Sequence, residues 1–185
     1  MKKKILILLT ALTLSSYVHA EDISYYRIDG MKVGDSLLDY LSEKEILEYF
    51  AKDFQEFIQI SMPGKKFDII AINYLKNDEN YIIHELSGRT ALKYEECLKE
   101  QQDIVNDIST QFIDESVQID NIGEAIYRGD DSGKSTLNVV NFYFENGIMH
   151  VACYNISETL NVPKFLAISV ASLEWFDWQS NRAFK

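Results

Sequence analysis

The chain has 185 residues, of which 18 are basic and 29 acidic, giving a formal net charge of −11. Its length fits one domain of ordinary size, with enough hydrophobic residues for a core of its own. Because phosphate binding depends on clustered Lys and Arg, so acidic a chain is a poor partner for nucleic acid and for anionic lipid, and we expect a self-repelling monomer.

The first twenty residues have the three parts of a secretory signal peptide. Lys2 to Lys4 form a basic stretch, Ile5 to Leu14 form an apolar run too short to span a bilayer, and Val18-His19-Ala20 fits a signal-peptidase site. We expect cleavage after Ala20, export to the periplasm or the medium, and one mature domain over residues 21–185. Loss of the three lysines would take the charge from −11 to −14. No second long apolar run follows, so we expect no stable membrane anchor.

Two cysteines, Cys97 and Cys153, remain in the expected mature chain. An even number in an oxidising compartment favours a disulfide, and both fall on faces that we expect to be buried. Closing this loop would stabilise the fold by roughly 4 kcal/mol in the chain-entropy treatment. The alternative is two buried thiols. A redox-catalytic role is disfavoured because there is no Cys-x-x-Cys pair.

The first half of the mature chain predicts short helices followed by strands. A first short helix is expected from Asp35 to about Leu41. A second should begin at the capping box that Ser42 forms with Glu45 and run to about Ala51. A weak alternation predicts a short first strand before them. Strands rich in Ile, Phe and Tyr, separated by turn residues, are predicted at 23–28, 54–62, 67–75 and 81–86.

The second half predicts one long helix, three strands and a last helix. Apolar residues at three-to-four spacing predict the long helix over residues 93–112, and Cys97 lies on its apolar side. Asn146-Gly147 is a hairpin signal, because both positions tolerate a positive φ. The last helix should run from Pro163 to about Gln179. The strands are predicted at 117–128, 136–145 and 148–156.

Together these elements predict an α+β fold. Consecutive hairpins favour an antiparallel sheet of about six strands in two three-stranded meanders. We expect the helices to pack mainly on one face of that sheet. No linker rich in Pro, Gly or Ser divides the chain, so a single domain is expected.

Several short stretches carry a resemblance to a known family. They are Gly34-Asp35-Ser36-Leu37-Leu38-Asp39-Tyr40 with Ser42 to Ile46, Asn80-Tyr81-Ile82-Ile83, Glu95-Glu96-Cys97, Asp131-Ser132-Gly133-Lys134-Ser135-Thr136, and Cys153-Tyr154. In these the chain resembles a family of small exported bacterial proteins of unknown function, found mainly in the proteomes of marine bacteria. The resemblance implies a shared fold and an envelope or secreted location, and no catalytic activity.

Residues 129–136, Gly-Asp-Asp-Ser-Gly-Lys-Ser-Thr, nearly match a phosphate-binding loop. Only three residues separate the first glycine from Gly-Lys where that loop needs four, and the residues that follow are strand-like rather than helical. Asp130 and Asp131 would also repel phosphate. We interpret the segment as a hairpin turn and expect no cofactor.

His84 and His150 are the two histidines of the expected mature chain. Two histidines without close spacing do not predict a zinc site, and no Asp-x-Asp-x-Asp-Gly loop predicts a calcium site, so we expect no metal. Each lies within a predicted strand, which favours a structural role. The alternative is acid–base chemistry with Glu85 or a distant carboxylate. No Gly-x-Ser-x-Gly motif supports a nucleophilic serine, and we nominate no catalytic residue.

Three aromatic residues, Trp175, Phe176 and Trp178, lie near the end of the last predicted helix. They either complete the core, with Trp178 left near the surface, or form an interaction site. Our leading hypothesis is a non-catalytic binding or interaction module of the cell envelope, with an unknown protein or small ligand as partner. The alternatives are a small periplasmic hydrolase whose site is assembled from distant strands, and a secreted inhibitor or effector.

Overall fold

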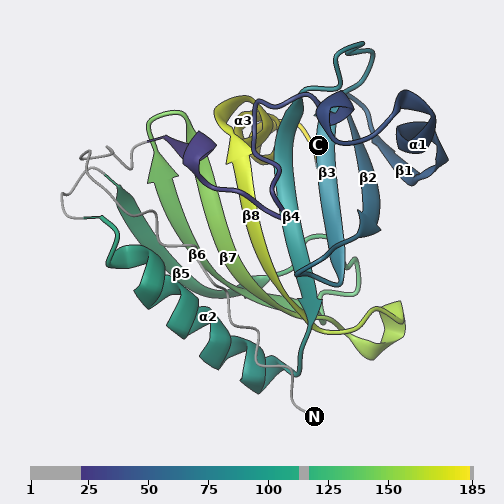
Figure 1. Ribbon diagram of the computed structural model, residues 1–185. Helices are drawn as coiled ribbons and strands as arrows, with labels where there is room; N and C mark the ends of the chain where they lie inside the picture. The colour runs from purple at the N-terminus through teal and green to yellow at the C-terminus, as the bar shows by residue number, and fades with distance from the viewer. Residues whose placement is uncertain (1–21, 113–116, 184–185) are drawn as a thin grey trace.

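The computed structural model describes residues 22–112 and 117–183. Within them, eight strands form one antiparallel sheet in the order β1-β2-β3-β4-β8-β7-β6-β5 (Figure 1). The strands are β1 (Phe50–Phe54), β2 (Phe57–Pro63), β3 (Ile69–Leu75), β4 (Ile83–Ala91), β5 (Gln118–Ile126), β6 (Thr136–Phe144), β7 (Gly147–Asn155) and β8 (Phe165–Ser172).

Two meanders of four strands each make up this sheet. In β1–β4 and again in β5–β8, each strand pairs with the next along the chain, and the meanders join where β4 pairs antiparallel with β8. The prediction of about six strands in two three-stranded meanders was therefore wrong. Each meander has one strand more than the sequence pattern indicated.

The two missed strands, β1 and β8, fail to show the usual strand pattern for different reasons. β1 is an exposed edge strand, so it lacks the alternation of a half-buried strand. In β8, Leu166 and Ala167 are both buried although they face opposite sides of the sheet. A continuous apolar run of this kind cannot be told from a buried helix by periodicity. The last helix accordingly begins at Leu173 rather than Pro163.

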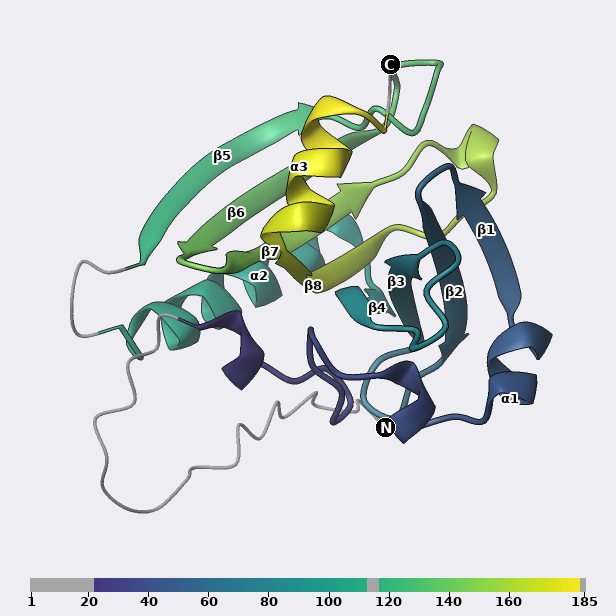
Figure 2. The same cartoon turned by 90° about the horizontal axis from the view of Figure 1, so that it is seen from above.

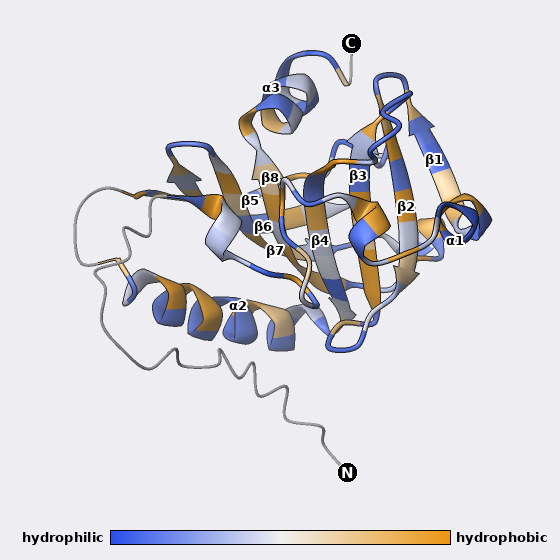
Figure 3. Ribbon diagram, turned by 45° about the horizontal axis from the view of Figure 1, so that its top comes forward, coloured by the Kyte–Doolittle hydropathy of each residue, from blue (hydrophilic) through white to orange (hydrophobic). Residues whose placement is uncertain are grey.

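The helices are divided between the two faces of the sheet, so the expectation that they pack mainly on one face was also wrong. Helix α2 (Tyr94–Ser109) covers one face, and helix α3 (Leu173–Asn181) covers the other (Figure 3). The hydrophobic core is correspondingly split. The larger cluster includes Leu86, Ile104 and Val151, and the smaller one contains Phe57, Trp175 and Trp178.

The amino-terminal part of the described chain covers the same face as α2. It contains two short 3-10 turns, Ile23–Tyr25 and Leu37–Asp39, and helix α1 (Glu43–Glu48). The capping box of Ser42 with Glu45 is confirmed. Residues 23–28, predicted as a strand, instead form the first turn and a single bridge to Met31.

Helix α2 is fixed to strand β7 by a covalent bond and by hydrogen bonds. The predicted disulfide is confirmed, since Cys97 on α2 is bonded to Cys153 on β7. One turn along the helix, the buried Gln101 side chain donates to the main-chain oxygens of Val151 (2.7 Å) and Asn138 (3.0 Å). These contacts leave the opposite face of β7 for α3.

Helix α3 lies across the opposite face of the sheet, above β7 and β8 (Figure 2). Its Trp175 and Trp178 rings lie 4.8 Å and 5.1 Å from the Phe57 ring, centroid to centroid. Trp178 is only 2% exposed, so the expectation that it lies near the surface was wrong. The reason is that β8 turns directly into α3, which folds both indoles down onto the sheet.

Two turns predicted from the sequence are present. The predicted hairpin joins β6 to β7, but its two turn residues are Glu145 and Asn146, because Gly147 is already paired with Phe144. Neither Asn146 nor Gly147 has a positive φ. Gly147 is instead required by space, because a Cβ there would collide with the Ile23 side chain and the Ala171 main-chain oxygen. The predicted turn lies in the connection from β5 to β6, residues 127–135, where Asp130 accepts from the main-chain nitrogens of Ser132 (2.9 Å) and Ser135 (3.0 Å).

None of the helices in the described ranges is long and apolar enough to cross a membrane. The predicted signal peptide lies outside those ranges.

Candidate functional site

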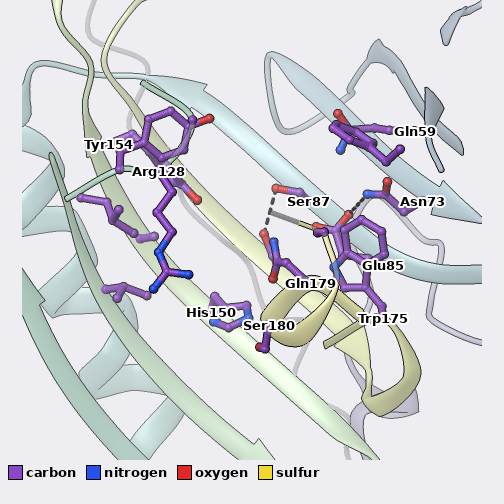
Figure 4. A pocket seen from close by; sticks show the side chains of 18 of the residues that line it. Gln59, Asn73, Glu85, Ser87, Arg128, His150, Tyr154, Trp175, Gln179 and Ser180 are labelled. Carbon is purple, nitrogen blue, oxygen red and sulfur yellow. Dashed lines mark hydrogen bonds between the residues drawn. The ribbon is translucent and has the colours of Figure 1, made fainter. Parts of the chain in front are cut away.

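A pocket of about 610 Å³ lies between α3 and the sheet. Side chains from all eight strands and from α3 line it, which means that this face of the sheet is concave. In Figure 4, Gln59, Asn73 and Glu85 lie on one side of the pocket and Arg128 and Tyr154 on the other. Its volume is within the range of small-molecule sites.

Polar side chains cross the floor of this pocket in two adjacent rows. The first row runs from β4 to β1, and its members are paired across neighbouring strands: Glu85 with Asn73, Asn73 with Gln59, and Gln59 with Lys52. The second row runs from β6 to β4, and its pairs are Asn141 with His150, His150 with Ser169, and Ser169 with Ser87. We call these eight residues the polar band.

The polar band interrupts a face that is otherwise apolar under α3. Asn73, Glu85, Ser87 and Asn141 are between 0% and 6% exposed, a degree of burial that such residues seldom have. Burial of a polar group costs free energy unless it is hydrogen-bonded, and an apolar residue would fill each position more cheaply. A polar band in this place is therefore typical of a site rather than of a core.

Among the described residues that line the pocket, Glu85 carries the one carboxyl group. Its carboxyl oxygen accepts a hydrogen bond from the Asn73 side-chain amide. Burial raises the pKa of Glu85 to about 7, although the Arg89 charge and hydrogen bonds from Asn73 and Ser169 act in the opposite direction. Near neutral pH this group can therefore either donate or accept a hydrogen bond.

Two buried polar atoms beside the pocket have no hydrogen-bond partner in the described part of the chain. They are the Asn73 side-chain oxygen and the indole nitrogen of Trp178. One is an acceptor and the other a donor, and both residues line the pocket. Buried polar atoms are nearly always hydrogen-bonded, so two unpaired atoms beside one pocket are unusual.

His150 lies in the pocket as a neutral imidazole. Burial lowers the pKa of His150 to about 4. Its Nδ1 lies 2.6 Å from Oδ1 of Asn141, while the Asn141 amide nitrogen donates to the Tyr143 hydroxyl at 3.2 Å. Because the Asn141 oxygen is an acceptor, Nδ1 carries the proton and Nε2 carries the lone pair. His150 thus offers one further acceptor.

His84 has a different environment, at the start of α3. Its Nδ1 lies 3.2 Å from the Ser172 hydroxyl and 3.5 Å from the Glu174 carboxylate. A Ser-His-acid triad needs the serine and the acid on different ring nitrogens, whereas here both approach the same one. Ser172 also caps α3 by accepting from the Trp175 main-chain nitrogen (3.2 Å). Burial lowers the pKa of His84, and the residue is not part of the pocket lining.

The structure separates the residues that the sequence singled out. Trp175 and Trp178 line the pocket, and the Phe176 ring lies 6.2 Å from the His150 ring. The disulfide is on the far face. His84 and Glu85, considered together as an acid–base pair, form no hydrogen bond with each other in the described chain.

Most of the polar band was missed by sequence reasoning. The available signal was the period-two pattern of Glu85, Ser87 and Arg89, which places three polar side chains on one face of β4. Asn73 and Ser169 are single polar residues within apolar strands and gave no recognisable motif. Their proximity depends on strand order, which the pattern did not reveal.

In the described residues, no group of three or more His, Cys, Asp or Glu side chains is placed to hold a metal ion. A scan of known protein families, a search of curated proteins and a search of solved structures each found no match to this chain.

Proposed function

We propose that this protein is a non-catalytic binding module that holds a small organic molecule in the pocket between α3 and the sheet. The observation that carries the proposal is the polar band, four of whose members are almost completely buried on the pocket floor. The unpaired Asn73 oxygen and Trp178 indole nitrogen add to the polar character of the same region, although both atoms are covered by the protein.

The pocket has the mixed character of a ligand site. Trp175, Trp178 and Phe54 supply apolar and aromatic surface, while the polar band supplies a few hydrogen-bonding groups. Small-molecule sites combine these two features, the apolar surface for affinity and the polar groups for orientation. Under this proposal the aromatic residues of α3 act inside the pocket rather than on an exposed interface.

A hydrolase remains the second candidate, and one observation favours it. Glu85 has a pKa of about 7 in a pocket, which suits a general acid or base. Against it, neither described histidine is arranged with a serine and a carboxylate as a nucleophilic site requires. Turnover of p-nitrophenyl acetate that is abolished by Glu85→Gln would favour the hydrolase. A secreted inhibitor or effector has no specific observation in its support.

We also propose that the protein is exported and acts as a monomer in the periplasm or the medium. The signal-like segment at residues 1–20 supports export, and the disulfide fits an oxidising compartment. The resemblance to small exported bacterial proteins points the same way. Mass spectrometry of the exported chain should find Glu21 at its amino terminus, and an intact Met1 would contradict this part of the proposal.

The chain contains a convenient reporter for binding. Its two tryptophans both line the pocket, so a ¹H–¹⁵N spectrum should show two indole signals, and both report on the site. We expect neutral aromatic fragments, such as benzamide and phenol, to shift these signals saturably.

A matched pair of variants tests whether the shifts arise in the pocket. Ala152 lines the pocket, and Ala152→Phe should fill it and abolish the shifts. Ala51 is exposed on β1, and Ala51→Phe should leave them unchanged. Binding that survives Ala152→Phe in a folded protein, or no saturable shift with any fragment, would disprove the proposed function.

A further inference from the structure

The charges that line the pocket are opposite in sign to the charge of the chain as a whole. Acidic residues outnumber basic ones by 29 to 18. The pocket lining nevertheless contains three cationic side chains, Lys52, Arg89 and Arg128, and one carboxyl group, that of Glu85. A local excess of cations in an acidic protein raises the local concentration of anions there.

These cations have no salt-bridge partner in the described chain, although the Arg89 charge opposes the rise in the pKa of Glu85. None of the salt bridges among the described residues includes Lys52, Arg89 or Arg128. Arg89 is partly buried on the pocket floor, where its Nε lies 3.5 Å from the Ser87 hydroxyl and its guanidinium carbon 5.8 Å from the centre of the Phe165 ring. A guanidinium within about 6 Å of a ring face is attracted to it electrostatically, and its N–H groups can still bind an anion.

Glu85 and Arg89 occupy opposite ends of the pocket floor. On β4, Glu85 and Arg89 face the same side and are four residues apart, which corresponds to about 13 Å along a strand. Glu85 is paired with Ala171, which lies near the end of β8, two residues before α3 begins. Glu85 therefore lies at the α3 end of the pocket, together with Trp175 and Trp178. Arg89 lies at the far end.

The far end has further groups suited to an anion. Tyr154 is stacked on Phe165, with ring centres 4.4 Å apart and an interplanar angle of 14°. Burial raises the pKa of Tyr154 to about 12, so its hydroxyl stays protonated and can donate. Arg128, in the β5–β6 connection, extends toward the pocket from the same side as Tyr154 (Figure 4).

From this arrangement we propose that the ligand is a small organic carboxylate with an apolar or aromatic body. Its carboxylate binds Arg89, Tyr154 and Arg128, and its body extends over Ser87 toward Trp175. A guanidinium and a carboxylate have matching planar geometry, which favours a carboxylate over a neutral group at the Arg89 end. This inference rests on the proposed binding function.

The test compares two probes that differ in charge and little else. We would titrate 4-phenylbutyrate and 4-phenylbutanamide into the wild-type protein at pH 7.5 and follow the two indole signals. Charge-assisted hydrogen bonds exceed neutral ones by about 1 kcal/mol, which corresponds to a preference of about fivefold for the carboxylate. Inorganic phosphate at the same concentration should bind far more weakly, because it lacks the body.

The matched variants are Arg89→Gln and Arg27→Gln. Arg89→Gln should abolish the preference for the carboxylate and leave the binding of the amide within about twofold. Arg27 pairs with Asp35 at the protein surface and does not line the pocket, so Arg27→Gln should keep the full preference. Circular dichroism of both variants would establish that they are folded.

The outcomes separate this inference from the proposed function. Equal binding of the two probes to the wild type, or a preference that survives Arg89→Gln, would overturn the carboxylate inference and leave the binding module standing. Binding of benzamide or phenol without binding of 4-phenylbutyrate would do the same. If no probe or fragment shifts either indole, both proposals fail.

Discussion

Asn73 and Glu85 lie opposite each other on β3 and β4, and the Asn73 amide donates a hydrogen bond to the Glu85 carboxyl group. Asn73 is fully buried, and Glu85 is 6% exposed. The Asn73 amide nitrogen is thus satisfied while its oxygen has no partner. An apolar pair would have been cheaper to bury, so this polar pair lowers the stability of the sheet at this point.

Replacement of Glu85 by Gln should change how stability depends on pH. The folded-state pKa of Glu85 is raised from 4.5 to about 7, so between these values the folded protein binds more protons than the unfolded chain. Stability therefore falls as pH rises through this window, by up to roughly 3 kcal/mol from this group at about 1.4 kcal/mol per pKa unit. Glu85→Gln removes that loss, because Gln accepts the Asn73 hydrogen bond and does not ionise.

The measurement is the free energy of unfolding of both proteins in urea at pH 4.5 and pH 8. As pH rises, the free energy of unfolding of the wild type should fall relative to that of Glu85→Gln. Glu79→Gln, at an exposed position of the β3–β4 connection, serves as control and should run parallel to the wild type. Parallel curves for Glu85→Gln as well would show that the Glu85 carboxyl is solvated at neutral pH.

Loss of the disulfide should destabilise the protein strongly. Cys97 and Cys153 are 56 residues apart, and releasing a loop of this length costs about 4 kcal/mol in the chain-entropy treatment. The double variant Cys97→Ala/Cys153→Ala should therefore unfold at a much lower urea concentration than the wild type. Adding dithiothreitol to the wild type should reproduce the effect, and an unchanged midpoint in reductant would contradict it.

Truncation of Trp178 to alanine should cost about 3–5 kcal/mol, because its ring packs against Phe57 and Trp175 in the smaller core cluster. Trp178→Phe should cost much less. It keeps an aromatic ring there and removes an indole N–H that has no partner among the described residues, so no hydrogen bond is lost. Urea unfolding of both variants provides the comparison. Equal losses for the two would indicate that the indole N–H is satisfied by bound water.

Substitution of Gly147 by alanine should destabilise the β6–β7 hairpin by about 1–3 kcal/mol through overpacking. The added Cβ would meet the Ile23 side chain and the main-chain oxygen of Ala171. Trimming the side chain with Ile23→Ala should relieve only part of the cost, because the backbone oxygen cannot move without disturbing β8. Thermal unfolding of the single and double variants would measure this, and a Gly147→Ala protein as stable as the wild type would contradict the close contact.

Local chemistry along the chain was sufficient for several features. The capping box at Ser42, the amphipathic helix carrying Cys97, the β6–β7 hairpin and the turn at residues 129–136 each depend on residues close in sequence, and each is present. The disulfide could also be predicted, because two cysteines on buried faces leave one possible pairing. In all of these the deciding interactions span a few residues or involve a single pair.

The number of strands, the side on which α3 packs and the pocket were decided only by tertiary structure. The run at residues 165–172 is mostly apolar on both sides, and only its position between β4 and β7 makes it a strand. Asn73, Ser169 and His150 are unremarkable alone and become a site because the pairing of β3, β4, β8 and β7 aligns them. Strand order is set by burial summed over the whole sheet, and no local segment of the sequence contains that sum.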